Sequence, residues 1–476
     1  MDFSDLANVA VDASTRLGAD YSEARVHVSS YKGYVMKNGE EDPLRLSSER
    51  GISVRVIVDG ALGFASTNTL LKVEVQRVAA EAVKAAKASS KHVKERIVFS
   101  KENQYRGRWE APMKKPPDSL PLDSKFALLA EVEDWISPDN VKTDVPYRLF
   151  VLTEATEEKV FVNCEGSEIY SIVPRIGFYF TLTAHEAGKG TAQRMMEFGS
   201  ACGWEVLSEW RIHEVIQGEA LTLGRILREA EQPPRGEVDL VLGSEIVGII
   251  CHESCGHPQE ADRILGREMA QAGGSYLKAE MIGKRIGSEA VTVVDDPTLP
   301  KSYGYYLYDD EGVKASERVL IDKGVIRGFL HNRETAYKLG TRSNGAARAV
   351  AYDREPIVRM ANTYMKPGDY SFEELIADVS EGVYVKSFTE WNIDDRRFNQ
   401  RYVGLEAYKI KGGELTGLVK NPILEITTPG LYGSVDAVGR IVSFEAATCG
   451  KGEPMQPAPV WHGGPEIRLR KIKLGG

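Results

Sequence analysis

Residues 238–258 read VDLVLGSEIVGIICHESCGHP, and this stretch decides what fold we expect around it. Val238–Leu242 is typical of a buried strand, and Ser244 is suited to cap the helix that follows. Residues 246–251 are apolar on nearly every side, which predicts a buried helix. We therefore expect a strand and then a helix that carries His252–His257 into a dry, rigid interior.

The two histidines of this stretch, His252 and His257, lie five residues apart. On a regular α-helix this spacing turns the second imidazole well over a quarter-turn away from the first. Both rings can face one point if the helix gains a residue, as in a π-bulge, or breaks before His257. Gly256 lacks a side chain that would resist the distortion, and Pro258 cannot continue the hydrogen-bond ladder. We predict a helix that bulges or ends at the second histidine.

These residues also predict chemistry. Neutral imidazoles are zinc ligands, and the carboxylate of Glu253, next to the first histidine, can accept a proton from a water molecule that the metal activates. The alternative is an ordinary histidine pair. With 8 histidines in 476 residues, this spacing followed by glutamate arises by chance in about one such chain in a hundred. The pattern therefore favours a hydrolytic metal centre.

Composition limits the protein class. The chain has 476 residues, enough for two or three domains, and a net charge of −9, which gives no electrostatic support to a nucleic-acid partner. Its five cysteines are scattered and form no disulfide framework. The N-terminus shows no signal sequence, and no stretch is long enough to span a membrane. We expect a cytoplasmic protein with no membrane association.

Two proline-rich segments suggest the domain boundaries. The first contains Pro112, Pro116, Pro117 and Pro121, and the second is Gln232–Gly236. We predict an α+β fold: an N-terminal α/β region, followed by a strand-rich domain that carries the metal-site helix. The predicted domains are 1–110 and 111–234, both α/β, and 235–476, the strand-rich catalytic domain.

Periodicity predicts the individual elements. Apolar stripes indicate helices near 4–17, 71–82, 123–136 and 205–230. Alternation indicates strands at 24–28, 52–58 and 61–65, and several more between 147 and 198. Asp322–Gly324 and Lys411–Glu414 read as hairpin turns. The tyrosines at 303, 305, 306 and 308 could line a peptide groove, but their spacing fits an ordinary strand better.

A catalytic zinc needs a third protein ligand. Nearby acids are Glu260, Asp262 and Glu268, but Pro258 makes their directions hard to predict. Cys255 lies so close to both histidines that it would crowd the ion, so we interpret it as a core residue. Cys449 lies in what reads as a glycine-flanked loop after the strand-like residues 441–444. From composition alone, Cys449 can be either a metal ligand or a buried thiol without a metal.

The motif at 252–257 resembles the HExxxH signature of the TldD/PmbA family of metallopeptidases. Further segments of the C-terminal half resemble the family, and Gly51–Thr67 resembles its N-terminal domain more weakly. The motif places the chain with the TldD branch, because the PmbA (TldE) branch lacks it. The resemblance implies that the third ligand is a cysteine near the C-terminus, which is Cys449 here. The similar segments are 293–296, 308–312, 330–336, 343–345 and 359–364.

The resemblance implies a zinc-dependent peptidase in which His252, His257 and Cys449 hold Zn²⁺ and Glu253 is the general base. It also implies peptide or unfolded-protein substrates, and a homodimer or a heterodimer with a paralogue that lacks the motif. A metal-dependent amidase acting on small molecules would use the same residues. A structural zinc in an interaction subunit would need a fourth ligand, for which Cys255 is the one obvious candidate.

The sequence assigns no role to some of the polar residues. Four of them lie in segments that resemble the family: His331, Arg333, Asn344 and Arg348. They could contact substrate, although such residues more often hold the fold together. The remaining histidines have no partner pattern: His27, His92, His185, His213 and His462.

Overall fold

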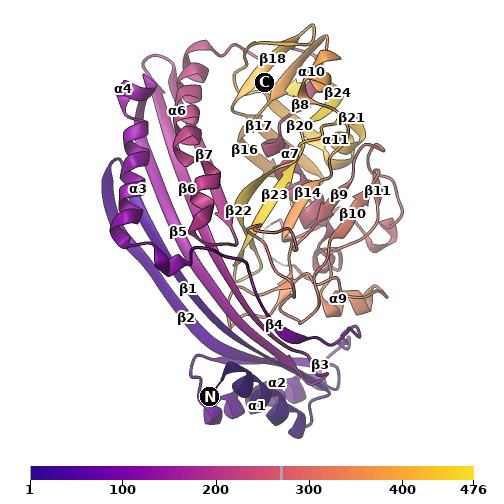
Figure 1. The fold of residues 1–476 in the computed structure, drawn as a ribbon. Coiled ribbons are helices and arrows are strands. Elements are labelled where there is room, and N and C mark those ends of the chain that lie inside the picture. Colours follow the sequence, from indigo (N-terminus) through magenta and orange to yellow (C-terminus); the bar gives the residue numbers. More distant parts are fainter. Residues whose placement is uncertain (1, 269–271, 476) are drawn as a thin grey trace.

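The computed structural model describes residues 2–268 and 272–475. The fold is mixed α+β, as predicted, with a sheet of very long strands beside a strand-rich C-terminal domain (Figure 1). None of the helices in the described ranges is both long and apolar enough to cross a bilayer.

The N-terminal sheet has the strand order β3-β2-β1-β5-β6-β4, with β7 paired to β6. Neighbouring strands are antiparallel except β4 and β6. The sheet is continuous across both predicted N-terminal regions, because β1 pairs directly with β5. Its strands are β1 (Tyr21–Lys37), β2 (Glu40–Val58), β3 (Ala61–Thr67), β4 (Arg106–Glu110), β5 (Asp144–Asn163), β6 (Glu168–Glu186) and β7 (Gly190–Ser200).

Two helical layers cover the two ends of these long strands (Figure 1). One apolar core joins α1 and α2 to the Val26 end of β1, and a second joins α3 and α6 to its Met36 end. Side chains alternate along a strand, so Glu23, Arg25 and His27 point away from the α1/α2 core. The helices are α1 (Phe3–Arg16), α2 (Lys72–Ser90), α3 (Leu122–Trp135), α4 (Pro138–Val141), α5 (Leu207–Trp210) and α6 (Ile212–Glu229).

The predicted long helix at 205–230 is interrupted. Arg211 adopts a left-handed conformation (φ 49°) between α5 and α6, which separates the two helices. The predicted helices near 4–17, 71–82 and 123–136 are confirmed, as are the strands at 24–28, 52–58 and 61–65. The predicted strand through the tyrosines at 303–308 is wrong, because this segment forms turns with one isolated bridge at Tyr308.

The C-terminal domain is built on two larger sheets and a short pair, β12 with β13. One sheet has the order β11-β10-β9-β14-β23-β22, and the other has the order β16-β17-β20-β24-β8-β15-β18-β19, with β21 paired to β24. The turns at Asp322–Gly324 and Lys411–Glu414 connect β10 to β11 and β18 to β19, as predicted. A single apolar core contains residues from both sheets and from helix α7.

The strands of this domain are β8 (Glu237–Leu242), β9 (Val293–Asp295), β10 (Arg318–Asp322), β11 (Val325–Ile326), β12 (Ala347–Arg348), β13 (Ile357–Val358), β14 (Asn362–Met365), β15 (Glu381–Val385), β16 (Phe388–Ile393), β17 (Asn399–Gly404), β18 (Ala407–Lys411), β19 (Glu414–Leu418), β20 (Ile423–Thr427), β21 (Val435–Val438), β22 (Ser443–Lys451), β23 (Gln456–Gly464) and β24 (Ile467–Gly475). The helices are α7 (Ser244–Ile250), α8 (Ala261–Ile264), α9 (Arg333–Lys338), α10 (Phe372–Ala377) and α11 (Thr428–Ser434).

Candidate metal centre

The helix that carries the histidines changes geometry where the spacing requires it. After β8, helix α7 continues into a π-helix, Cys251–Gly256, and then into a 3-10 turn at His257–Gln259. A π-helix has more residues in each turn than an α-helix. Its wider turn places His252 and His257, which are five residues apart, on the same face. The predicted bulge at the second histidine is therefore confirmed. The predicted cap is displaced by one residue, because Gly243 occupies the N-cap and Ser244 begins the helix.

Gly256 is needed here for a second reason. A Cβ at this position would overlap Sδ of Met360 and would lie 3.1 Å from Oγ1 of Thr363, on β14. The absent side chain lets the π-helix pack closely against that part of the domain. Glycine thus permits both the local distortion and the tertiary contact.

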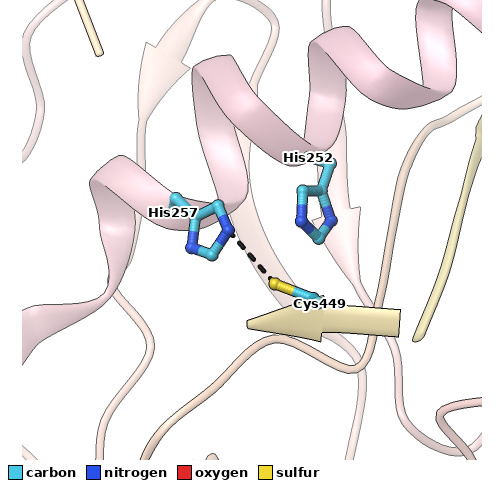
Figure 2. Close-up of side chains that lie close together, drawn as sticks. All are labelled: His252, His257 and Cys449. Carbon is cyan, nitrogen blue, oxygen red and sulfur yellow. Dashed lines mark hydrogen bonds between the residues drawn. The ribbon is translucent and has the colours of Figure 1, made fainter. Parts of the chain in front are cut away.

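His252, His257 and Cys449 converge on one point (Figure 2). Their ligand atoms all lie within 4.8 Å of one another, and Sγ of Cys449 is 3.2 Å from Nε2 of His257. The three side chains are buried, with exposures of 5%, 2% and 8% respectively. Cys449 lies on the edge strand β22, opposite Ala458 of β23, so the predicted loop position is wrong.

The orientation of His257 is set by Glu260. Nδ1 of His257 lies 3.0 Å from Oε2 of Glu260, which also accepts from Nε of Arg263 (2.6 Å) and lies 3.2 Å from Nζ of Lys451. Burial acts to raise the pKa of Glu260, but the charges of Lys451, His257 and Arg263 hold it well below its ordinary value. The carboxylate favours the tautomer with hydrogen on Nδ1. Nε2, which faces Cys449, then keeps a free lone pair that can ligate a metal ion.

His252 lacks a comparable partner. Its Nδ1 is buried without a hydrogen-bond partner among the described residues. Burial lowers the pKa of both His252 and His257, which favours the neutral imidazoles that metal binding needs. The ring of His462 lies 5.9 Å from that of His252. His462 had no partner pattern in the sequence, because its neighbour is 210 residues away in the chain.

The thiol of Cys449 has an unusual environment. Burial acts to raise its pKa, but His257 and Arg359 lower it to about 7. Metal binding also deprotonates a thiol ligand, so the three side chains can offer two imidazole nitrogens and one thiolate sulfur, all of which are zinc ligands. Ligand atoms on one tetrahedral zinc lie roughly 3.5 Å apart, so small side-chain rotations would close the present spacing. With the unpartnered Nδ1 of His252, these features fit a zinc ion.

Glu253 has two partners that sequence reasoning missed. Its carboxylate forms an ion pair with Arg397 and accepts a hydrogen bond from Nε1 of Trp391 at 3.3 Å. Burial acts to raise the pKa of Glu253, but Arg397, His257 and His252 hold it below its ordinary value. Arg397 follows β16 and has a positive φ of 61°. No local pattern in the sequence links this turn to the histidine helix.

The other ligand candidates lie in different arrangements. Asp262 pairs with Lys451 at 2.7 Å, and Cys255 does not belong to the group of potential ligands found among the described residues. Burial raises the pKa of Cys255 well above its ordinary value, as expected for a core thiol. A fourth protein ligand is therefore absent from the described part of this cluster, which disfavours a closed structural zinc site.

The polar residues without an assigned role mostly hold segments together. Asn344 accepts from the backbone N–H of His331 and donates to the carbonyl of Phe329. Arg333 bridges to the N-terminal region through Tyr21 Oη, the carbonyl of Ser100 and Glu165. Arg348 lines a separate cavity, together with Tyr305, Tyr306 and Tyr308.

Family models match almost the whole chain. Residues 235–476 match the C-terminal domain of the PmbA/TldA metallopeptidases, 22–86 match domain 1, and 115–230 match the central domain. The chain belongs to the TldD/PmbA family. Within this family, the chain is 32% identical over 472 residues to a metalloprotease of Methanothermobacter thermautotrophicus, with 99% of this chain and 98% of the relative covered.

Two further relatives extend the comparison. A zinc metalloprotease TldD homolog of Saccharolobus solfataricus is 33% identical over 246 residues, covering 51% of this chain and 53% of the relative. The crystal structure of TldE from Thermococcus kodakarensis superposes with a TM-score of 0.75 at 18% identity, covering 98% of this chain and 99% of that one. At this identity, the TldE structure supports the shared TldD/PmbA fold.

Proposed function

We propose that the protein is a zinc-dependent metallopeptidase that hydrolyses peptide bonds in peptides or unfolded proteins. The observation that carries this proposal is the convergence of His252, His257 and Cys449 beside the buried carboxylate of Glu253. The names of the relatives support a metallopeptidase, and one of them names zinc. A zinc ion bound here would supply Lewis acidity that activates water and polarises a carbonyl group.

The chain's own residues would divide the remaining work. Glu253 would accept the proton of the attacking water and deliver it to the leaving amine. Arg397 keeps this carboxylate ionised and, with Trp391, limits its rotation. Glu260 holds the imidazole of His257 so that Nε2 faces Cys449. The buried setting of all three ligands keeps bulk water away from the reacting groups.

Compartment and assembly form part of the same proposal. All five cysteines are free, and the proposed centre needs a reduced Cys449, so we place the protein in the cytoplasm. We also propose a dimer, with a second copy or with a paralogue lacking the motif. Light scattering of the purified protein, alone and mixed with such a paralogue, tests the assembly.

The central experiment combines zinc analysis with digestion of an unfolded protein and of short amides. Wild type should contain about one zinc per chain, and it should cleave the unfolded protein. Cys449→Ala should lose both zinc and cleavage. Glu253→Gln should keep zinc and lose cleavage by a factor of 10² or more, because general-base catalysis contributes about 10²–10⁴. Glu390→Gln, an exposed glutamate on β16, is the matched control and should behave as wild type.

Other results would redirect the proposal. Cleavage of short amides without any attack on unfolded protein would identify an amidase that acts on small molecules. Full peptidase activity in Glu253→Gln would remove its role as the base. Zinc retained in Cys449→Ala at wild-type affinity would exclude the thiolate as a ligand.

A further inference from the structure

A cavity separate from the metal centre lies between the N-terminal sheet and the C-terminal domain. Its volume is about 110 Å³. One wall comes from β1, β4, β5 and β6. The other comes from residues 305–306, 308–310, 347–350, 359 and 456–459. The described residues that line the cavity do not include the three candidate ligands or Glu253.

Three arginines that line the cavity have no carboxylate partner. Arg25, Arg348 and Arg359 form no ion pair with any described carboxylate and donate only to backbone carbonyl groups. Arg25 and Arg359 are almost fully buried, with exposures of 4% and 1%. The accepting carbonyls are those of Ala351 and Arg354 for Arg25, Met360 and Pro459 for Arg348, and Gln456 and Cys449 for Arg359.

The same cavity contains hydrogen-bond donors that have no acceptor. Nε of Arg25, Nε of Arg359 and Nε1 of Trp109 are buried without a partner in the described structure. Buried N–H groups are almost always paired, because an unpaired one destabilises the folded protein. Three such groups around one cavity indicate an acceptor that the protein itself does not provide.

The remaining charges of the cavity balance each other. Arg175 pairs with Glu157, and Lys159 lies 3.2 Å from Asp310. Asp309 accepts hydrogen bonds from the backbone N–H groups of Glu311, Val313 and Ala347, so the backbone already compensates its single negative charge. The three arginines therefore leave the cavity with an excess of positive charge.

Unpaired buried cations are costly to a folded protein. Burial lowers the pKa of Arg25 in spite of the opposing charges of Asp310 and Glu23, and burial lowers that of Arg348 to about 10. These directions agree with the absence of a counter-ion in contact with either side chain. An anion in the cavity would offset the cost and accept from the unpaired N–H groups.

We propose that the cavity binds one carboxylate group attached to a small apolar body. Glu157 and Asp310 oppose a doubly charged anion, whereas Phe161, Val173 and Pro457 offer apolar surface. At roughly 10–15 Å³ for each water-sized group, the volume has room for a ligand of about the size of butyrate. The side chains of Glu157 and Lys159 remain 22% and 19% exposed, which leaves solvent access at this edge.

The side chain of Arg359 connects the cavity to the metal centre. Nη2 of Arg359 donates to the carbonyl of Cys449 at 2.6 Å, so this arginine touches both the cavity and the strand of the thiol ligand. Either a free small carboxylate or the C-terminal carboxylate of a peptide has the chemistry that the cavity selects. The site itself does not depend on the proposed peptidase activity.

The test is calorimetric titration of the full chain with four probes: butyrate, N-acetyl-dialanine, its C-terminal amide, and inorganic phosphate. Butyrate should bind saturably, and the amide should bind at least tenfold more weakly than N-acetyl-dialanine. Binding of butyrate alone supports a free carboxylate as the ligand, and comparable binding of N-acetyl-dialanine supports a peptide terminus. Loss of a charge-assisted hydrogen bond corresponds to about tenfold or more in affinity.

Variants separate this cavity from the metal centre. Arg348→Gln should weaken butyrate binding about tenfold, Arg348→Lys should weaken it less, and Arg225→Gln on α6 should leave it unchanged. His252→Ala should keep butyrate affinity within about twofold. The proposal is overturned if wild type binds neither carboxylate, if phosphate binds more tightly than both, or if binding is lost in His252→Ala and kept in Arg348→Gln. The wild-type titrations do not depend on the folding of any variant.

Discussion

Nδ1 of His257 lies 3.0 Å from Oε2 of Glu260, a carboxylate that is completely buried three residues further along the chain. Glu260 also lies against Arg263 and Lys451, so its position is fixed by two cations. Lys451 is two residues beyond Cys449 on the same strand. One buried carboxylate thus links the histidine helix to the strand that carries the thiol.

Glu260→Gln should weaken zinc binding by about 10–100-fold, the usual effect of removing a carboxylate that orients a histidine ligand. The amide can still accept a hydrogen bond, but it cannot compensate Lys451 and Arg263. Competition with a chelator of known affinity measures the change. Asp262→Asn, which alters the neighbouring partner of Lys451, is the control and should have a smaller effect. Equal zinc affinity in Glu260→Gln and wild type would contradict the orienting role.

Arg397→Gln should shift the pH dependence of cleavage. The charge of Arg397 lowers the pKa of Glu253, so its removal should raise that pKa. The base works only when ionised, and the acid limb of kcat/KM should therefore move to higher pH. The loss of activity should be larger at pH 6 than at pH 8.

Arg396→Gln, at the adjacent position, is the control for this shift. Arg396 is exposed and is not one of the main influences on the pKa of Glu253, so the acid limb of Arg396→Gln should match that of wild type. A uniform loss across the pH range in Arg397→Gln would show that the arginine acts in some other way.

Gly256→Ala should destabilise the fold by about 1–3 kcal/mol, because the new methyl group overlaps Sδ of Met360. Denaturant unfolding of the metal-free protein measures the change. Gly218→Ala in α6 is the matched control: nothing lies within 4 Å of its added Cβ, so helix propensity should stabilise it by up to about 1 kcal/mol. Met360→Ala should relieve part of the loss in the double variant, and a purely additive result would exclude the overlap as the cause.

Acid should destabilise the metal-free protein below about pH 6.5, partly through His331. Burial lowers the pKa of His331 to about 4, so between these values the unfolded chain binds a proton that the folded chain does not. The contribution of neutral His331 to the free energy of unfolding is fully present above pH 6.5. It falls by up to about 3 kcal/mol as the pH drops to 4. Unfolding free energies at pH 7.5, 6 and 5 should decrease less in His331→Gln than in wild type. The exposed His92→Gln should keep the wild-type slope.

Features that depend on neighbours in the chain could be predicted from the sequence. The five-residue spacing of His252 and His257, with Gly256 and Pro258 beside it, predicted the π-helical distortion. The turns at Asp322–Gly324 and Lys411–Glu414 were likewise predicted correctly. These features follow from steric and hydrogen-bonding rules that act over a few residues.

The partners of those residues were decided by tertiary structure. Cys449 meets His257 across 192 residues because β22 lies at the edge of the sheet that packs on the helix. Arg397 reaches Glu253 across 144 residues, and Arg25 shares a cavity with Arg348. Sheet register and domain packing set these distances, and neither produces a local pattern in the sequence from which it could be predicted. The chain itself thus determined the histidine motif and its local distortion, whereas only the packed fold decided which distant sulfur and charges surround it.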